Sequence, residues 1–398
     1  MMLVLRKVAC ARWLSLHKLA RGGSRAARTL STSARRSTVM PAWVIDQYGN
    51  NSELRFTQNA LLPIIHYPNE VIVKVHAAGL NPIDINMRGG YGAATLAAKR
   101  DPLCINQTNT EFPLILGRDV SGEIMECGLD VRYFKPGDEV WAAIPPWKQG
   151  SLAEFVVLSA NEVSCKPKSL SHADAASIPY VAATAWSALV NTGGLNKDNC
   201  AKKRILILGG SGGVGTFAIQ LVKSWGAHVT VTCSQDADRL VRGVGADDVV
   251  DYTSGPVETK LQALEKFDLI LDNIGGETEN WALGLLKPWC GAKYVTLVTP
   301  FLLNTDQLGL ADGMMRNGVT IATKALKHLT KGIHYRWGFF APSGPTLDDI
   351  REMVDAGKIR AVVEETFSFA QVPQAFEKVE KGHARGKTVV AITRDQQE

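Results

Sequence analysis

Long apolar runs and clustered cysteines are both absent from this 398-residue sequence. No stretch reaches the roughly 20 apolar residues that a membrane-spanning helix needs, so we expect no integral membrane span. The seven cysteines occur singly, without a Cys-x-x-Cys pair or a close Cys/His cluster, which argues against a disulfide framework and a structural zinc site. The 45% apolar and 21% charged residues are those of an ordinary globular chain.

Acidic residues are also absent from the N-terminal segment, where the first is Asp46. The first 36 residues hold seven arginines and two lysines. An Arg-rich, Ser-containing leader without acids is typical of a mitochondrial transit peptide, and a basic tail without structure is the alternative. We predict a transit peptide over residues 1–40, cleaved between about Arg28 and Met40, and a location in the mitochondrial matrix.

The net charge of +5 comes from this leader. Without it, 35 basic residues stand against 39 acidic ones, so the body carries a charge of −4. A body of that charge has no electrostatic reason to bind nucleic acid, and we expect no nucleic-acid partner.

The hydropathy pattern changes in character along the body. Residues 41–165 are β-rich: apolar side chains alternate from Val71 to Ala77, and similar short strands are predicted over 122–127, 139–144 and 153–158. A helix is predicted from Ala173 to Val190. Apolar strands and amphipathic helices then alternate, which predicts an α/β fold with a doubly wound parallel sheet. The C-terminal stretch adds helices predicted over 346–356 and 372–381 and strands predicted over 362–366 and 388–392.

A glycine-rich turn joins the first of these strands, 205–208, to a helix predicted over 214–225. Gly210, Gly212 and Gly215 satisfy the pattern G-x-G-x-x-G. Glycines let a pyrophosphate approach the backbone, and the helix N-terminus offers free N–H groups and a positive dipole end. The turn therefore predicts dinucleotide binding; a glycine-rich turn without a ligand is the alternative.

The end of the second strand indicates which dinucleotide. NAD sites place an acid there for the ribose 2′-hydroxyl, but this strand ends without an acid before Asp236. Ser234 as a donor, Arg239 as a counter-ion and a hydroxyl from Tyr252 could instead hold a 2′-phosphate. We therefore predict NADPH as the cofactor, although Asp236 and Asp238 speak against it.

Five stretches in a fixed order make the chain resemble the medium-chain dehydrogenase/reductase superfamily. They are Gly79–Asp84, Leu116–Gly122, Lys135–Val140, Gly150–Phe155 and Asp272–Gly276. The zinc alcohol dehydrogenases of that superfamily carry Cys-His where this chain has Asn81-Pro82, so the chain is more similar to the zinc-free quinone oxidoreductase branch, and no metal site is expected. Residues 41–46, 301–304 and 382–387 are similar to the mitochondrial members of that branch, which implies a reticulon as a partner.

The resemblance implies a GroES-like β-barrel catalytic domain built from residues 41–180 and 344–398, with a Rossmann cofactor domain over 181–343. It also implies homodimers, as in many family members. By family position, a set of residues would contact the dinucleotide from its phosphates to its nicotinamide ring. These are Ser211, Gly212, Gly213, Val214, Ser234, Arg239, Tyr252, Asn273, Leu297, Phe340, His383, Ala384 and Arg385.

Three residues are candidates for the chemistry. Asn81 could hydrogen-bond a carbonyl or carboxamide, Asp84 could orient it, and Tyr91 could donate a proton. The alternatives are a turn residue before Pro82, a helix cap and a loop aromatic, respectively.

The function expected from these observations is hydride transfer from NADPH to a small-molecule quinone or enone, with ubiquinone or a precursor as the quinone in a mitochondrion. An enoyl-thioester reductase using Tyr91, and a nucleotide-binding partner protein with little turnover, are the alternatives. The basic segment 299–340 could form an exposed face or a lid.

Overall fold

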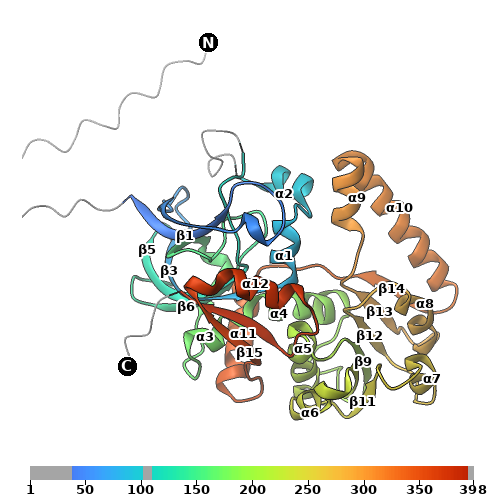
Figure 1. Ribbon diagram of the computed structural model, residues 1–398. Coiled ribbons are helices and arrows are strands. Elements are labelled where there is room, and N and C mark those ends of the chain that lie inside the picture. The colour runs from blue at the N-terminus through green and yellow to red at the C-terminus, as the bar shows by residue number, and fades with distance from the viewer. Residues whose placement is uncertain (1–37, 102–109, 393–398) are drawn as a thin grey trace, which may run out of the picture. The chain divides into compact units, whose positions relative to one another are not determined.

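The computed structural model describes residues 38–101 and 110–392, and all of them belong to one unit of the chain. Almost all of the predicted transit peptide lies outside the described residues. Among the helices that are described, none combines the length and the apolar character needed to cross a bilayer. The unit contains three sheets (Figure 1).

Two of these sheets, formed by residues from both ends of the chain, make up a first lobe. A three-stranded sheet has the order β2-β1-β4; a seven-stranded sheet has the order β15-β16-β3-β5-β6-β8, and β7 also pairs with β3. The strands are β1 (Val39–Ile45), β2 (Arg55–Leu61), β3 (Glu70–Leu80), β4 (Leu114–Ile115), β5 (Asp119–Cys127), β6 (Glu139–Ala143), β7 (Phe155–Ser159), β8 (Val163–Cys165), β15 (Val363–Ser368) and β16 (Lys387–Ala391).

The alternation of apolar side chains from Val71 to Ala77 predicted a strand. This strand is β3, which pairs with three others in the seven-stranded sheet. Val71, Val73 and Val75 of β3 are fully buried, as expected for one face of a strand. Antiparallel pairing brings the last strand alongside β3, with Thr388 opposite Leu80. The C-terminal strand therefore begins beside Asn81, the residue that follows β3.

A six-stranded, wholly parallel sheet of order β11-β10-β9-β12-β13-β14 forms the second lobe and confirms the predicted doubly wound sheet. Its strands are β9 (Arg204–Leu208), β10 (His228–Cys233), β11 (Asp248–Asp251), β12 (Leu269–Asp272), β13 (Lys293–Thr296) and β14 (His334–Trp337). The strand order reverses between β9 and β12, and open α/β sheets bind ligands beyond the carboxyl ends of the strands at such a point.

The helices cover both lobes. They are α1 (Pro82–Arg88), α2 (Ala93–Lys99), α3 (His172–Ala175), α4 (Pro179–Trp186), α5 (Gly213–Ser224), α6 (Asp238–Gly243), α7 (Val257–Gln262), α8 (Thr278–Ala282), α9 (Phe301–Leu308), α10 (Leu310–Leu329), α11 (Gly344–Asp355) and α12 (Val372–Glu380).

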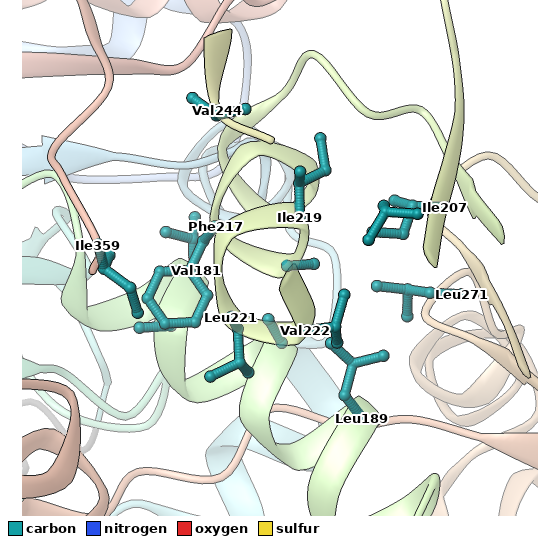
Figure 2. Close-up of a cluster of buried hydrophobic side chains, with 14 of the residues drawn as sticks. Val181, Leu189, Ile207, Phe217, Ile219, Leu221, Val222, Val244, Leu271 and Ile359 are labelled. Atoms are coloured by element: carbon teal, nitrogen blue, oxygen red, sulfur yellow. The ribbon is translucent and has the colours of Figure 1, made fainter. Parts of the chain in front are cut away.

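The largest hydrophobic core surrounds α5. Figure 2 shows Phe217, Leu221 and Val222 of this helix among side chains from α4 and from the strands β9 and β12. Val181 and Ile207 belong to the same buried cluster. This packing fixes the N-terminus of α5 next to the carboxyl end of β9.

Two predicted helices differ from those observed. The helix predicted over 173–190 is divided into α3 and α4, because Pro179 lacks an N–H donor and starts a new helix at its first position. The helix predicted from Thr346 begins at Gly344, because the Ser343 hydroxyl accepts a hydrogen bond from the Thr346 N–H, 3.2 Å away, and caps it.

Candidate active site

A cavity of about 890 Å³ lies where the glycine-rich turn, α4 and the C-terminal strand meet. Nine of the thirteen predicted cofactor residues line it. They are Ser211, Gly212, Gly213, Val214, Tyr252, Asn273, Leu297, His383 and Ala384. Of the three candidates for the chemistry, only Asn81 lines the cavity. The fold therefore brings most of the residues expected to contact the nucleotide together around this cavity.

The glycine-rich turn has the tight geometry that its pattern requires. Gly209 has φ 78°, a left-handed conformation that side chains disfavour. A Cβ at Gly215 would lie 2.4 Å from the Gly209 carbonyl oxygen, so only glycine lets α5 start this close to the turn. A Cβ at Gly212 would meet no atom within 4 Å. The backbone at Gly212 thus faces open space at the helix N-terminus, where a pyrophosphate could bind.

Asn273 provides an unsatisfied acceptor in the cavity wall. Its Nδ2 donates to the Leu208 carbonyl oxygen at 3.0 Å, which fixes the orientation of the amide. Its Oδ1 is buried and has no hydrogen-bond partner among the described residues. A buried polar atom without a partner costs about 1–3 kcal/mol. A ribose hydroxyl could fill this position, so the residues present fit a dinucleotide.

Ser234 and Arg385 come together at the end of β10, although neither lines the cavity. The Ser234 hydroxyl donates to Oδ1 of Asp236 at 2.5 Å, and the Arg385 guanidinium pairs with the other oxygen of the same carboxylate. The hydrogen bond from Ser234, together with the Arg385 cation, lowers the pKa of Asp236. Beside them, the Tyr252 hydroxyl lies 3.4 Å from Nδ1 of His383. Two donors that suit a phosphate thus converge on one anion.

Arg239 and Phe340 are the remaining predicted contacts outside the cavity wall. Arg239 is exposed on α6. Phe340 stacks on Tyr180, with ring centroids 4.2 Å apart and an interplanar angle of 12°, and Tyr180 lines the cavity. Phe340 therefore acts on the cavity through Tyr180 in this structure.

A buried network that the sequence did not reveal holds Asn81. The Lys387 ammonium donates to Oδ1 of Asn81 at 2.5 Å and to the Leu80 carbonyl oxygen at 2.7 Å. It also pairs with Oδ2 of Asp119 at 3.0 Å, and Nδ2 of Asn81 donates to the same carboxylate oxygen at 2.8 Å. Both ends of the Asn81 amide are thus fixed by oppositely charged partners.

Burial governs the electrostatics of this network. Complete burial raises the pKa of the Asp119 carboxyl, and the Lys387 cation and the donors from Asn81 and Tyr180 oppose that rise. Lys387 also lines the cavity, and a Cβ at Gly213 would lie 2.8 Å from its Cδ. The network therefore places a positive charge between Asn81 and the phosphate-binding turn.

Asp84 has a structural role in the fold. Its carboxylate accepts from the Asn81 N–H at 2.9 Å and from the Gly117 N–H at 2.8 Å, and it is fully buried beside Arg118. Burial raises its pKa, against the effect of Arg118. The side chain closes the capping box of α1 and so positions Asn81 through the backbone. Its contacts with Asn81 agree with an orienting role, whereas a catalytic role stays a prediction.

Tyr91 is half-buried and lies outside the cavity wall. Burial, helped by the Asp306 carboxylate, raises the pKa of its hydroxyl, which therefore carries its proton at neutral pH. A proton donor at the nicotinamide would need a different position of this side chain, so this role also stays a prediction.

Two family models match this chain and establish its family. The model described as "Alcohol dehydrogenase GroES-like domain" matches residues 67–168, and the model described as "Zinc-binding dehydrogenase" matches residues 244–390. The chain belongs to the medium-chain dehydrogenase/reductase superfamily. The predicted combination of a GroES-like domain and a Rossmann-like sheet is confirmed.

Within that superfamily the chain is similar to mitochondrial NAD(P)H oxidoreductases. It is 80% identical over 371 residues to "NAD(P)H oxidoreductase RTN4IP1, mitochondrial" of Danio rerio, covering 93% of this chain and 96% of the relative. It is 35% identical over 356 residues to "Reticulon-4-interacting protein 1, mitochondrial" of Caenorhabditis elegans, covering 89% and 96%. These names support the prediction of a mitochondrial protein that uses a nicotinamide cofactor.

Among solved structures, the quinone oxidoreductase from Coxiella burnetii is similar over most of its length. The TM-score is 0.72 with 28% sequence identity, covering 89% of this chain and 99% of that one. The protein is therefore an NAD(P)H-dependent oxidoreductase with quinone-oxidoreductase-like neighbours.

The residues present do not fit a zinc ion at Asn81. Zinc in proteins binds thiolates, imidazoles and carboxylates. Here the oxygens of Asn81 and Asp119 already accept from the Lys387 ammonium. In the parts of the chain that the structure describes, no three His, Cys, Asp or Glu side chains form a group that could hold a metal ion.

Proposed function

We propose that this protein is a zinc-independent reductase of the mitochondrial matrix that transfers hydride from NADPH to a quinone-type acceptor, with ubiquinone or a precursor as the candidate. One observation carries the proposal. The dinucleotide turn and several apolar side chains, among them Ile83, Val181, Ile274 and Trp281, line one and the same cavity. Apolar slots with few polar anchors suit flat, apolar ligands such as quinones.

A bound nicotinamide would supply the hydride. The protein's own part is to orient both rings, exclude water and stabilise charge that develops on the acceptor oxygen. The N-terminus of α5 would hold the pyrophosphate, and Oδ1 of Asn273 would accept from a ribose hydroxyl. Lys387 would keep Asn81 fixed and hold a positive charge close to the reacting oxygen.

The preference for NADPH rests on Ser234 and Arg385. Their two donors now converge on Asp236 and could turn to a 2′-phosphate, as could the hydroxyl of Tyr252. Removing a charge-assisted hydrogen bond costs about 1.5–3 kcal/mol, which is roughly ten- to a hundredfold in affinity.

The test of this preference is a fluorescence titration of Arg385→Ala with NADPH and with NADH. We expect affinity for NADPH to fall at least about tenfold and affinity for NADH to stay unchanged. Arg242→Ala is the matched control, because Arg242 pairs with Asp238 on the surface and does not line the cavity. Equal losses for both nucleotides would contradict the preference for NADPH.

The acceptor is tested by oxidation of NADPH in the presence of short-chain ubiquinone analogues, enones and a crotonyl thioester. Oxidation of NADPH with a quinone supports the proposal. If no quinone is reduced, the proposal is refuted. Because Tyr91 lies outside the cavity wall, we expect Tyr91→Phe to leave quinone reduction unchanged. Tight binding of NADPH without any turnover would indicate a nucleotide-binding partner protein instead, for which the reticulon implied by the resemblance is the candidate partner.

A further inference from the structure

The outward face of α10 carries an apolar stripe. The inward face of this helix packs against β14 through the partly buried Ile321, with Asn317 and His328 buried beside it. On the opposite side, Met315, Val319 and Leu326 are 67%, 63% and 66% exposed. Positions four and seven residues apart lie on one side of a helix, so these side chains form one continuous row.

This stripe belongs to an unusual concentration of exposed apolar side chains. Of the twenty large apolar side chains that are exposed in the described residues, ten lie between residues 298 and 339. They are Val298, Leu303, Leu308, Leu310, Met314, Met315, Val319, Leu326, Leu329 and Phe339. Large exposed apolar patches on soluble proteins mark interaction sites.

Cations border the stripe, while acids are scarce. Arg316 and Lys327 directly follow Met315 and Leu326 in sequence, and both are exposed, as is Lys331 beyond the end of the helix. Residues 301–337 hold five basic and two acidic residues, whereas the rest of the chain after residue 36 holds 30 basic and 37 acidic ones. The segment that contains the stripe thus has a net charge of +3, whereas the rest of the body has a net charge of −7.

We propose that the outward face of α10 docks on the surface of an anionic lipid bilayer, with the apolar stripe among the lipid headgroups and Arg316, Lys327 and Lys331 against their phosphates. An exposed apolar stripe bordered by lysine and arginine on a helix has the chemistry of a surface that lies in the membrane interface. A second copy of the chain is the other candidate occupant of this face, and the experiment below distinguishes the two.

The position of α9 connects this surface to α2, a helix of the first lobe. The Asp306 carboxylate of α9 accepts from the Gly92 N–H at 2.6 Å and from the Ala94 N–H at 3.1 Å, and the hydroxyls of Thr95 and Thr305 lie 2.8 Å apart. The helix pair therefore rests on α2, which lies beside α9 in Figure 1. If the proposed function holds, docking would bring the active site near a bilayer in which long-chain quinones dissolve.

Flotation with lipid vesicles tests the docking without reference to catalysis. The chain from Thr38 is used, because the cations of the leader would bind anionic vesicles by themselves and all three sheets lie within this unit. We expect it to float with vesicles of phosphatidylcholine and phosphatidylglycerol, to float much less with phosphatidylcholine alone, and to be released by salt.

Two variants and one matched control locate the surface. Met315→Ser combined with Val319→Ser and Leu326→Ser should lower vesicle binding at least about tenfold. The control combines Leu129→Ser with Tyr133→Ser, two side chains that are 87% and 94% exposed outside this segment, and should bind like the unchanged chain. Arg316→Glu with Lys327→Glu should also reduce binding; it keeps the test valid if the apolar variant does not fold.

Three outcomes overturn the proposal. The unchanged chain does not float with anionic vesicles; the α10 variants float as well as the control; or light scattering shows a dimer that the apolar variant converts to a monomer. The last outcome would assign the stripe to a second copy of the chain. Urea-unfolding midpoints that match the unchanged chain establish that each variant is folded.

Discussion

Replacing Lys387 by methionine tests the buried network on which the site depends. The Asp119 carboxylate is fully buried and accepts from Lys387, from Asn81 and from the Tyr180 N–H at 2.5 Å. Methionine keeps most of the length of the side chain but removes the ammonium. An unpaired charge then remains in the interior, and breaking a buried ion pair in this way costs about 3–5 kcal/mol.

The assay is urea unfolding at neutral pH, followed by fluorescence, with the free energy extrapolated to water. We expect Lys387→Met to lose about 3–5 kcal/mol of unfolding free energy. Asp119→Asn combined with Lys387→Met should lose clearly less than the sum of the two single variants, because no buried charge is left unpaired. If Lys387→Met loses less than about 1 kcal/mol of unfolding free energy, or if the losses of the two single variants add up in the double variant, the Lys387–Asp119 pair does not stabilise the fold as expected.

Further predictions concern other parts of the chain. Gly212→Ala should leave the unfolding free energy within about 0.5 kcal/mol, because its Cβ meets no atom, yet lower NADPH affinity in a fluorescence titration; unchanged affinity would contradict the placement of the pyrophosphate. Gly215→Val should unfold at clearly lower urea, because its Cβ would collide with the Gly209 carbonyl oxygen; an unchanged midpoint would refute this. Burial and then the stacked His76 lower the pKa of His172, so the unfolded chain binds more protons and the unfolding free energy should fall as pH drops below about 7. In His172→Gln this dependence should be weaker in urea titrations across pH 5–8, and an identical slope would argue against it.

The parts of the site that were predictable are local in sequence. The turn from Gly209 to Gly215 lies between a strand and a helix, so pattern alone placed it. Asn273 and Leu297 came from the resemblance and line the same cavity. Lys387 had no local signal except a charged residue at the start of an apolar strand, because its partners Asn81 and Asp119 are 306 and 268 residues away in sequence.

The segment 299–340 was the least predictable part of the fold. It forms α9, α10 and the sixth strand β14. Apolar side chains lie on both sides of α10, and Gly313 and Gly318, which disfavour a helix, lie within it, so the sequence pattern did not predict this helix. The polar cluster between Lys324, Glu279 and Tyr335 that ties this helix to the sheet is a tertiary feature.

The last strand makes the site depend on the completeness of the chain. The Gly386 N–H donates to the Ser211 carbonyl oxygen at 2.9 Å, and Lys387 follows it directly. During synthesis the glycine-rich turn emerges long before this strand does. A chain cut short by a premature stop after Gly382 would keep the entire six-stranded sheet, yet it would lack one wall of the nucleotide cavity. Mitochondrial quality control would then meet a nearly complete protein that cannot retain its coenzyme.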